Sequence, residues 1–177
     1  MVDIGAARAR YFLAVAPALP QCDFVGIEVR KKRVEKALEK IGQAGLANCR
    51  MIFGEAEKVI RDHFQAASVA AFTILFPDPW PKKRHLKRRT YQRPEVVDRL
   101  ARTLEPGGLI LLKSDSRPYL DAICEAMAAH PRLGRSDGDL SIGGGVASLD
   151  RPEETKYEAL WKEEGREIHR AAFRRSL

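Results

Sequence analysis

Cysteines and potential metal ligands are scarce in this sequence. Its three cysteines, Cys22, Cys49 and Cys124, lie far apart without a C-x-x-C pair, and its four histidines are scattered. An odd number of distant cysteines without metal-ligand spacing argues against a disulfide framework and a structural metal site. It favours reduced thiols in a reducing compartment. We therefore expect a cytoplasmic protein without a bound metal.

Long hydrophobic runs are also absent. The longest run, Tyr11 to Pro20, is shorter than the roughly 20 apolar residues that a membrane-spanning helix needs. Arg8 and Arg10 ahead of it give a faint likeness to a signal peptide, but Pro17 and Pro20, together with a strand-like segment before it, argue against that interpretation. We interpret the run as a core helix and expect no membrane partner.

Internal repeats are missing, and the only low-complexity stretch is the glycine run 143–145, which is typical of a loop. The 177 residues, of which 45% are hydrophobic and 31% charged, are typical of a globular protein with a real core. We therefore expect one domain over residues 1–177.

Acidic residues are missing from the most basic segment. The nine residues from Pro81 to Arg89 hold six of the 31 Lys and Arg, whereas the rest of the chain is nearly balanced against 24 Asp and Glu. Such a concentrated positive field favours a polyanionic partner, and nucleic acid is the first candidate. A solvated basic loop or a targeting patch is the alternative.

Short apolar runs alternate with helical patterns along most of the chain. Strands are expected at residues 2–4, 23–29, 49–53, 70–76 and 109–113, and helices at 8–19, 31–44, 55–64, 94–104 and 117–129. In the helix 31–44 the apolar positions are Val34, Ala37, Leu38 and Ile41. A last strand is favoured over a helix at 166–175. This alternation predicts an α/β fold of βαβ units with a parallel sheet and right-handed crossovers.

Glycines and acids follow the predicted strands at the points where each strand ends. They are Gly5, Glu28, Glu55, Asp78 and Asp115, one for each of the first five strands. Ligands of open α/β sheets bind outside the carboxyl ends of the strands, so these residues are the candidates for a site.

The first two strand ends have the character of a nucleoside site. An acid at the position of Glu28 accepts hydrogen bonds from ribose hydroxyls, although it could instead face the start of the next helix. Gly5 would let the backbone approach such a ligand closely. Ala7 and Ala9 follow where a glycine-rich loop has further glycines, so that signal is weak.

The turn after the fourth strand presents Asp78 from a stiff backbone. Pro77 and Pro79 flank it and restrict their neighbours, and Trp80 offers a flat face for stacking a base or an arginine. The alternative is a proline turn with a surface acid and a packed tryptophan.

These segments together resemble a known family. Residues 75–89, from Leu75 to Arg89, closely resemble the signature of the tRNA (guanine-N7)-methyltransferases. The segments 23–29, 54–56, 114–119 and 155–158 are similar to further motifs of that family and arrive in the same order. The likeness extends from about Asp3 to Phe173.

The resemblance implies a class I methyltransferase with a Rossmann-like, doubly wound and mostly parallel sheet, whose last strand is antiparallel. It implies S-adenosylmethionine as cofactor, tRNA as partner and a guanine of the tRNA variable loop as the methylated base. Together with the strand-end reasoning it gives the expected cofactor residues Asp3, Gly5, Glu28, Glu55 and Asp78. The expected substrate residues are Lys82, Asp115, Thr155, Lys156, Tyr157 and Glu158. For the RNA backbone we expect Lys83, Arg84, Lys87, Arg88 and Arg89.

The chemistry of guanine N7 suits these residue types. N7 carries a free lone pair, so no proton has to be removed and the task is positioning and charge management. Asp78 is the expected catalytic residue, because a carboxylate can offset the cation that forms on the base or accept the guanine N1–H and N2–H₂ donors.

The sequence departs from the family pattern at several points. Ala7 and Ala9 replace glycines, Glu55 stands where Asp is usual, and the chain begins at the first strand without the usual extension ahead of it. Because of these departures, a second hypothesis stays open: the protein is a relative of the family that binds tRNA without efficient catalysis. A methyltransferase acting on amino groups or small molecules is a third hypothesis, and the oligomeric state, monomer or homodimer, is left open.

Overall fold

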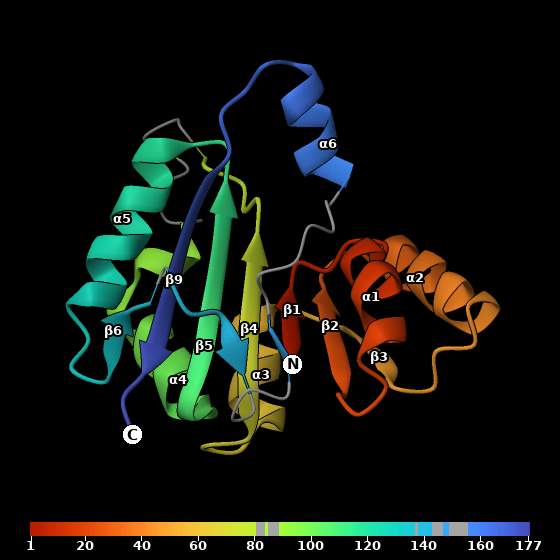
Figure 1. Cartoon of the computed structure of the whole chain (residues 1–177), viewed down its shortest axis with the longest axis horizontal. Helices are drawn as coiled ribbons and strands as arrows, with labels where there is room; N and C mark the ends of the chain where they lie inside the picture. Colours follow the sequence, from red (N-terminus) through yellow and green to blue (C-terminus); the bar gives the residue numbers. More distant parts are fainter. Residues whose placement is uncertain (81–83, 85–88, 137, 143–146, 149–155) are drawn as a thin grey trace.

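A seven-stranded mixed sheet with helices on both faces forms most of the molecule in this computed structural model, and two further strands form a small antiparallel sheet (Figure 1). The structure describes residues 1–177 except 81–83, 85–88, 137, 143–146 and 149–155, and gives only the backbone of residues 147, 148 and 156–159. The described strands are β1 (Val2–Ile4), β2 (Phe24–Glu28), β3 (Cys49–Phe53), β4 (Val69–Leu75), β5 (Leu104–Ser114), β6 (Leu133–Arg135), β7 (Ser141–Ile142), β8 (Ala147–Ser148) and β9 (His169–Arg175). The described helices are α1 (Arg10–Val15), α2 (Lys31–Gln43), α3 (Ala56–His63), α4 (Pro94–Thr103), α5 (Arg117–Ala128) and α6 (Lys156–Glu163), with short 3₁₀ helices η1 (Ala16–Ala18) and η3 (Thr90–Gln92).

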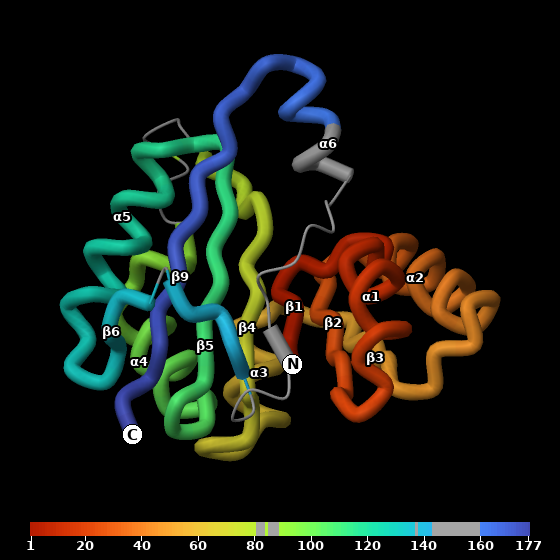
Figure 2. The backbone as a smooth tube through the Cα atoms, in the orientation of Figure 1, coloured from red at the N-terminus to blue at the C-terminus, as the bar shows by residue number. Residues whose placement is uncertain are grey.

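The order of the seven strands is β3-β2-β1-β4-β5-β9-β6. The first five run parallel, and β9 lies antiparallel between β5 and β6. The tube view shows that the N-terminal strand lies inside the sheet, while the C-terminal strand returns beside β5 (Figure 2). The predicted fold class, including the antiparallel last strand, is thereby confirmed.

Two hydrophobic clusters cover the two faces of the sheet. Helices α3, α4 and α5 contribute to one, and α1 and α2 to the other. The chain therefore changes face between β3 and β4, so β1 and β4, which are neighbours, lie at the switch point of the sheet. Doubly wound folds place their ligand sites at the carboxyl ends of the strands at this point.

Most elements lie where the hydrophobic pattern predicts them. Strand β3 matches its predicted range residue for residue, and Gly45, with φ of +65°, follows the end of α2 as expected. Within α2, Val34, Ala37 and Ile41 are buried, but Leu38 was wrongly expected on the buried face and is 49% exposed. A helix of this kind needs only a narrow apolar stripe to pack on a sheet, so one flanking leucine can stay in solvent.

Three boundaries were predicted wrongly. Helix α1 begins at Arg10 because Ala7 and Ala9 adopt left-handed backbone conformations, which no α-helix contains. It ends before Pro17, and η1 follows. Strand β5 begins at Leu104 rather than at residue 109, since the Pro-Gly-Gly segment 106–108 continues the strand through a shift of its register against β4.

The part of the chain after α5 contains elements that the hydrophobic pattern did not predict. Helix α6 and strands β6 and β7 had no clear pattern in the sequence. Helix α6 lies beyond the end of the sheet toward which β4 and β5 point (Figure 1). Among the described helices, none is both long and apolar enough to cross a bilayer.

Candidate active site

The loop after β1 folds over the end of β2. Gly5 adopts a φ of +78°, and the amides of Gly5 and Ala6 donate to the carbonyl oxygen of Ile27 at 2.9 and 3.1 Å. The amide of Ala7 donates to Glu28 Oε2 at 3.1 Å. A Cβ built on Gly26 would lie 2.8 Å from that of Ala6, so the bare backbone of Gly26 is what lets the loop lie so close to β2.

Both alanines of this loop occupy conformations that favour glycine. Ala7 has φ of 50° and Ala9 has φ of 55°, and each such residue costs roughly 1 kcal/mol or more for an L side chain. The loop thus adopts backbone conformations that favour glycine although alanines occupy these two positions. In front of Gly5 a Cβ would meet no atom within 4 Å, so this part of the loop faces open space.

Glu28 is buried and held from three sides. Only 3% of the residue is exposed, its Oε1 accepts the amide of Arg30 at 2.8 Å, and its Oε2 accepts that of Ala7 and lies 3.5 Å from Arg33 Nη1. Since Arg30 caps α2, the carboxylate does face the start of the next helix, the alternative considered above. Each oxygen retains a second lone pair, so a hydroxyl ligand can still be accepted.

Asp3 lies next to it at the centre of the sheet. Its Oδ1 accepts a hydrogen bond from Thr73 Oγ1 of β4 at 2.8 Å, and its Oδ2 has no partner in the described part of the chain. Burial raises the pKa of Asp3 to about 7, and the charge of Glu28 adds to that rise against the opposing hydrogen bond from Thr73. Asp3 thus titrates near neutral pH with one oxygen available to a ligand.

The turn that carries Asp78 follows β4 on the same edge of the sheet. Asp78 is exposed, and the turn is bracketed by Phe76 and Trp80, whose φ angles of 54° and 42° are both left-handed. The amide of Phe76 donates to the carbonyl oxygen of Lys113 at 2.8 Å. This backbone agrees with the expectation of a stiff turn, and the exposure of Asp78 also fits the alternative of a surface acid.

One tyrosine connects these acids. Burial raises the pKa of Tyr91, in η3, above its usual range, and Tyr119 and the charges of Asp3, Asp78 and Glu28 add to the rise. Tyr91 therefore lies within electrostatic range of all three acids, which belong to or follow the neighbouring strands β1, β2 and β4. The hydroxyl of Tyr91 has no hydrogen bond within the described residues.

The remaining predicted acids lie at the margins. The side chain of Glu55 is 61% exposed and its carboxylate lies 3.1 Å from Lys58 Nζ on α3, so it is not gathered with the others. Asp115, after β5, accepts a hydrogen bond from Arg166 Nη1 at 3.0 Å. The guanidinium of Arg166 also lies 4.0 Å from the ring centroid of Trp161, so this arginine ties the end of α6 to the end of β5.

The predicted RNA residues are only partly visible. Lys82, Lys83, Lys87, Arg88 and Thr155 lie outside the described residues, and Lys156, Tyr157 and Glu158 form the first turn of α6 with side chains that are not described. Arg84 is exposed, as an RNA-contacting residue must be. Arg89 differs, since it is half-buried and its Nε donates to the carbonyl oxygen of Pro79 at 2.6 Å.

Three residues of this region were missed from the sequence. Thr73 could have been found, because it is the only polar residue of β4. Tyr91 and Arg166 carried no such signal, since a single tyrosine or arginine outside a periodic pattern does not reveal which strand ends it will meet.

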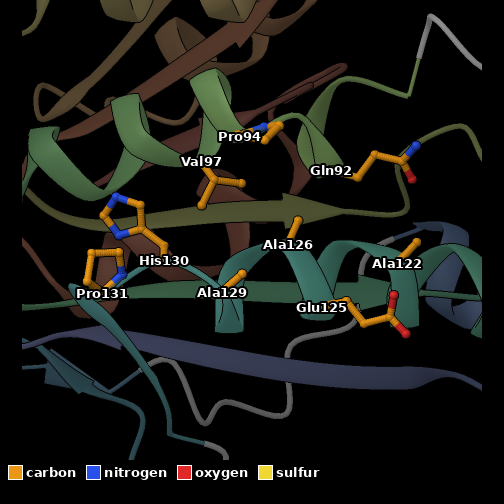
Figure 3. Close-up of a pocket in the computed structure, with 9 residues that line it drawn as sticks. All are labelled: Gln92, Pro94, Val97, Ala122, Glu125, Ala126, Ala129, His130 and Pro131. Carbon is orange, nitrogen blue, oxygen red and sulfur yellow. The ribbon is translucent and has the colours of Figure 1, made fainter.

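A separate hollow of about 480 Å³ lies between α4 and α5 (Figure 3). Its lining is Gln92, Pro94, Val97, Ala122, Glu125, Ala126, Ala129, His130 and Pro131. None of the residues expected for cofactor, base or RNA is among them, so the candidate site and this hollow are distinct. In the described residues no cluster of His, Cys, Asp and Glu could hold a metal ion.

Known structures resemble this fold. The 16S rRNA methyltransferase KamB aligns over 99% of this chain and 87% of its own, with a TM-score of 0.69 and 20% identity. The aminoglycoside resistance methyltransferase NpmB1 aligns over 98% and 85%, with a TM-score of 0.66 and 19% identity. At these identities the likeness concerns the fold, which is that of the class I methyltransferases.

Sequence relatives are closer. A family model described as "Putative methyltransferase" matches residues 1–171. The tRNA (guanine-N(7)-)-methyltransferase of Leifsonia xyli subsp. xyli is 36% identical over 98% of this chain and 74% of its own length. That of Nitrosococcus oceani is 34% identical over 100% and 72%. The chain therefore belongs to the tRNA (guanine-N7)-methyltransferase family.

Proposed function

We propose that this chain transfers the methyl group of S-adenosylmethionine to N7 of a guanine in the variable loop of tRNA, as a single domain acting in the cytoplasm. The observation that carries the proposal is the position of Asp3, Glu28 and Asp78 on or directly after the three neighbouring parallel strands β1, β2 and β4, at the switch point of the sheet. Family membership supplies the reaction, and this arrangement supplies a site where it can occur.

The residues at the ends of β1 and β2 fit a cationic ligand that carries a ribose. Glu28 is oriented by the amides of Ala7 and Arg30 and can still accept hydroxyl groups, while Asp3 offers one oxygen without a hydrogen-bond partner among the described residues. The open space in front of Gly5 leaves room for the ligand against the backbone. When bound there, S-adenosylmethionine supplies an electrophilic methyl group on a sulfonium.

Asp78 has the position and exposure to contact the guanine base. The guanine N7 lone pair would attack the methyl carbon as the bond from that carbon to the sulfonium sulfur breaks, leaving a neutral thioether. No side chain has to remove a proton, and the purine becomes cationic. The Asp78 carboxylate, held on the same edge as Asp3 and Glu28, offsets that charge or accepts the N1–H and N2–H₂ donors that distinguish guanine from adenine. Asp115 and the 155–158 segment are proposed to contact the same nucleotide.

The cations of the run 81–89 are proposed to neutralise tRNA phosphates. Each phosphate contact contributes about 0.7–0.9 to the slope of log K against log salt concentration. Replacing Lys82, Lys83, Arg84, Lys87 and Arg88 with Ser should weaken tRNA binding and flatten this slope. An unaltered slope, measured by filter binding between 50 and 200 mM salt, would count against the run as the RNA clamp.

Nucleoside analysis tests the function directly. Unmodified tRNA is incubated with the protein and isotope-labelled S-adenosylmethionine, digested and analysed by mass spectrometry. We expect labelled 7-methylguanosine, and none when the variable-loop guanine is replaced by adenine. Label on an exocyclic amino group would instead support the amino-group methyltransferase.

A binding protein without catalysis is the second candidate, and the left-handed Ala7 and Ala9 are the observation behind it. It is not favoured, because the relatives at 36% and 34% identity are both named as methyltransferases. Thermal melting separates the two. A cofactor at a hundredfold excess over its Kd stabilises the fold by about 2.7 kcal/mol, so an unshifted midpoint with retained tRNA binding would support the binding protein.

A further inference from the structure

Arg89 makes contacts that an RNA-binding side chain would not make. Its Nε donates to the carbonyl oxygen of Pro79 at 2.6 Å, and its guanidinium carbon lies 5.2 Å from the ring centroid of Tyr119. Tyr119 is only 1% exposed and belongs to the core beneath α5. The head group of Arg89 therefore lies between the Asp78 turn and α5, whereas Arg84 of the same basic run is exposed.

The turn that Arg89 contacts needs support from outside. Phe76 and Trp80 hold left-handed conformations although neither is a glycine, and such backbone persists only where its surroundings fix it. Pro77 and Pro79 have no amide hydrogen, so the turn can donate few hydrogen bonds of its own. The bond from Phe76 to the Lys113 carbonyl fixes its beginning, and the bond from Arg89 to the Pro79 carbonyl fixes its end.

Electrostatics agree with this placement. Burial raises the pKa of Tyr119 to about 12, with the positive charge of Arg89 opposing the rise and the negative charge of Asp78 adding to it. The guanidinium and the carboxylate thus act on the same ring. Arginine suits the position because its planar head can stack on the ring and donate along its edge at the same time.

We propose that Arg89 is a positioning residue that fixes the Asp78 turn against α5 for methyl transfer, and that it does not bind the RNA backbone. The inference rests on the proposed function and changes the role expected for this arginine from the sequence.

Steady-state kinetics and salt titrations with tRNA test the proposal. Arg89→Ala should lower kcat at least tenfold while the slope of log K against log salt stays at the wild-type value. Arg84→Ala removes the same charge from the exposed part of the run, and should lower that slope by about 0.7–0.9. Arg102→Ala on α4 is the matched control outside the site, and should change neither quantity.

Hydrogen exchange gives a second readout that does not depend on catalysis. Loss of the Arg89 contacts should raise exchange at the amides of Phe76, Asp78 and Trp80, and Arg84→Ala should leave it unchanged. Arg89→Lys, which keeps the charge but not the planar head, should give intermediate exchange and kcat. It also remains informative if the alanine variant folds poorly.

The outcomes of these experiments test the role of Arg89 separately from the proposed methyltransferase function. Unchanged exchange in the turn, a kcat of Arg89→Ala within twofold of wild type, or a slope lowered by one phosphate contact would each overturn the role of Arg89. If the wild-type protein forms no 7-methylguanosine, the proposed function fails. In that case the exchange experiment still decides whether Arg89 fixes the turn.

Discussion

Two neighbouring parts of the strand edge are built in opposite ways. At the ends of β1 and β2, Asp3 and Glu28 are buried, and hydrogen bonds from the loop and from β4 fix them internally. After β4, Asp78 is exposed on a turn that is fixed at its ends by Phe76 and Arg89.

The difference matches two kinds of ligand. Buried, oriented acids suit a small molecule that is enclosed and desolvated. Hydrogen bonds are strong in such a low-dielectric site, and side chains that are already oriented lose little further freedom when the ligand binds. An exposed acid on a stiff turn suits a macromolecule that can present only one nucleotide at a time. We infer that the first region serves the methyl donor and the second the base, and the four predictions below test this division.

The largest effect is expected at Asp78. Asp78→Asn keeps the shape but removes the charge that offsets the cationic base, so the single-turnover rate of methyl transfer should fall by about 10²–10³-fold. Because the side chain is exposed, the thermal midpoint should stay at the wild-type value. Affinity for S-adenosylmethionine should change little, and a large loss of it would contradict the division between the two regions.

Asp3 should have the next largest effect, and it acts on stability. Its pKa is about 7 in the folded state and about 3.9 in an unfolded chain, so between these values the folded state binds more protons. Stability from this group is therefore full below about pH 4 and is lost as the pH rises toward 7. Asp3→Asn should be more stable than wild type by on the order of a few kcal/mol at pH 8, and by less than about 1 kcal/mol at pH 4.

Denaturant unfolding from pH 4 to 8.5 measures this difference in the free energy of unfolding between Asp3→Asn and wild type. Thr73→Val gives a second test, since the hydrogen bond from Thr73 lowers the pKa of Asp3 and its loss should move the titration to higher pH. A gap between Asp3→Asn and wild type that is constant across the range would show that Asp3 is ionised throughout.

The sequence could predict the features of this site that depend on strand order and local backbone conformation. The acids at strand ends were predictable, because parallel strands bring their carboxyl ends to one edge whatever the details of packing. The strained loop was predictable in part, since Ala7 and Ala9 stand where glycines are expected, and their φ angles of 50° and 55° confirm that these positions are left-handed.

Contacts between distant elements could not be predicted. The approach of Thr73 to Asp3 depends on the register of β4 against β1, and that of Arg89 to Tyr119 on how α5 packs against the turn. A charge in a basic run gives no sign of the direction in which its side chain points. Likewise, the position of Glu55 after β3 and the family resemblance made it a candidate, but neither could predict that its carboxylate lies 3.1 Å from Lys58 Nζ.

Glu28 should show an intermediate effect on both stability and cofactor binding. In Glu28→Gln the new NH₂ group faces the amide of Ala7 or of Arg30, so one buried donor loses its acceptor, at a cost of about 1–3 kcal/mol. Calorimetric affinity for S-adenosylmethionine should fall at least tenfold. Glu39→Gln, which breaks an exposed pair with Lys36, is the matched control and should change neither quantity. Undiminished cofactor affinity in Glu28→Gln would leave this carboxylate a purely structural role at the start of α2.

The smallest effects are expected in the loop itself. Ala7→Gly relieves a left-handed conformation and should stabilise the fold by about 0.5–1 kcal/mol, net of the greater freedom of glycine in the unfolded chain. Ala9→Gly relieves a similar conformation, but Ala9 is fully buried and its methyl group contributes about 0.8 kcal/mol of packing, so the net change should be close to zero. Denaturant midpoints of the two single variants measure the difference between them. If the alanine methyl groups instead contact the ligand, Ala7→Gly will lower the affinity for S-adenosylmethionine. That result would show that side chains, as well as backbone, adapt the loop between β1 and β2 to its ligand.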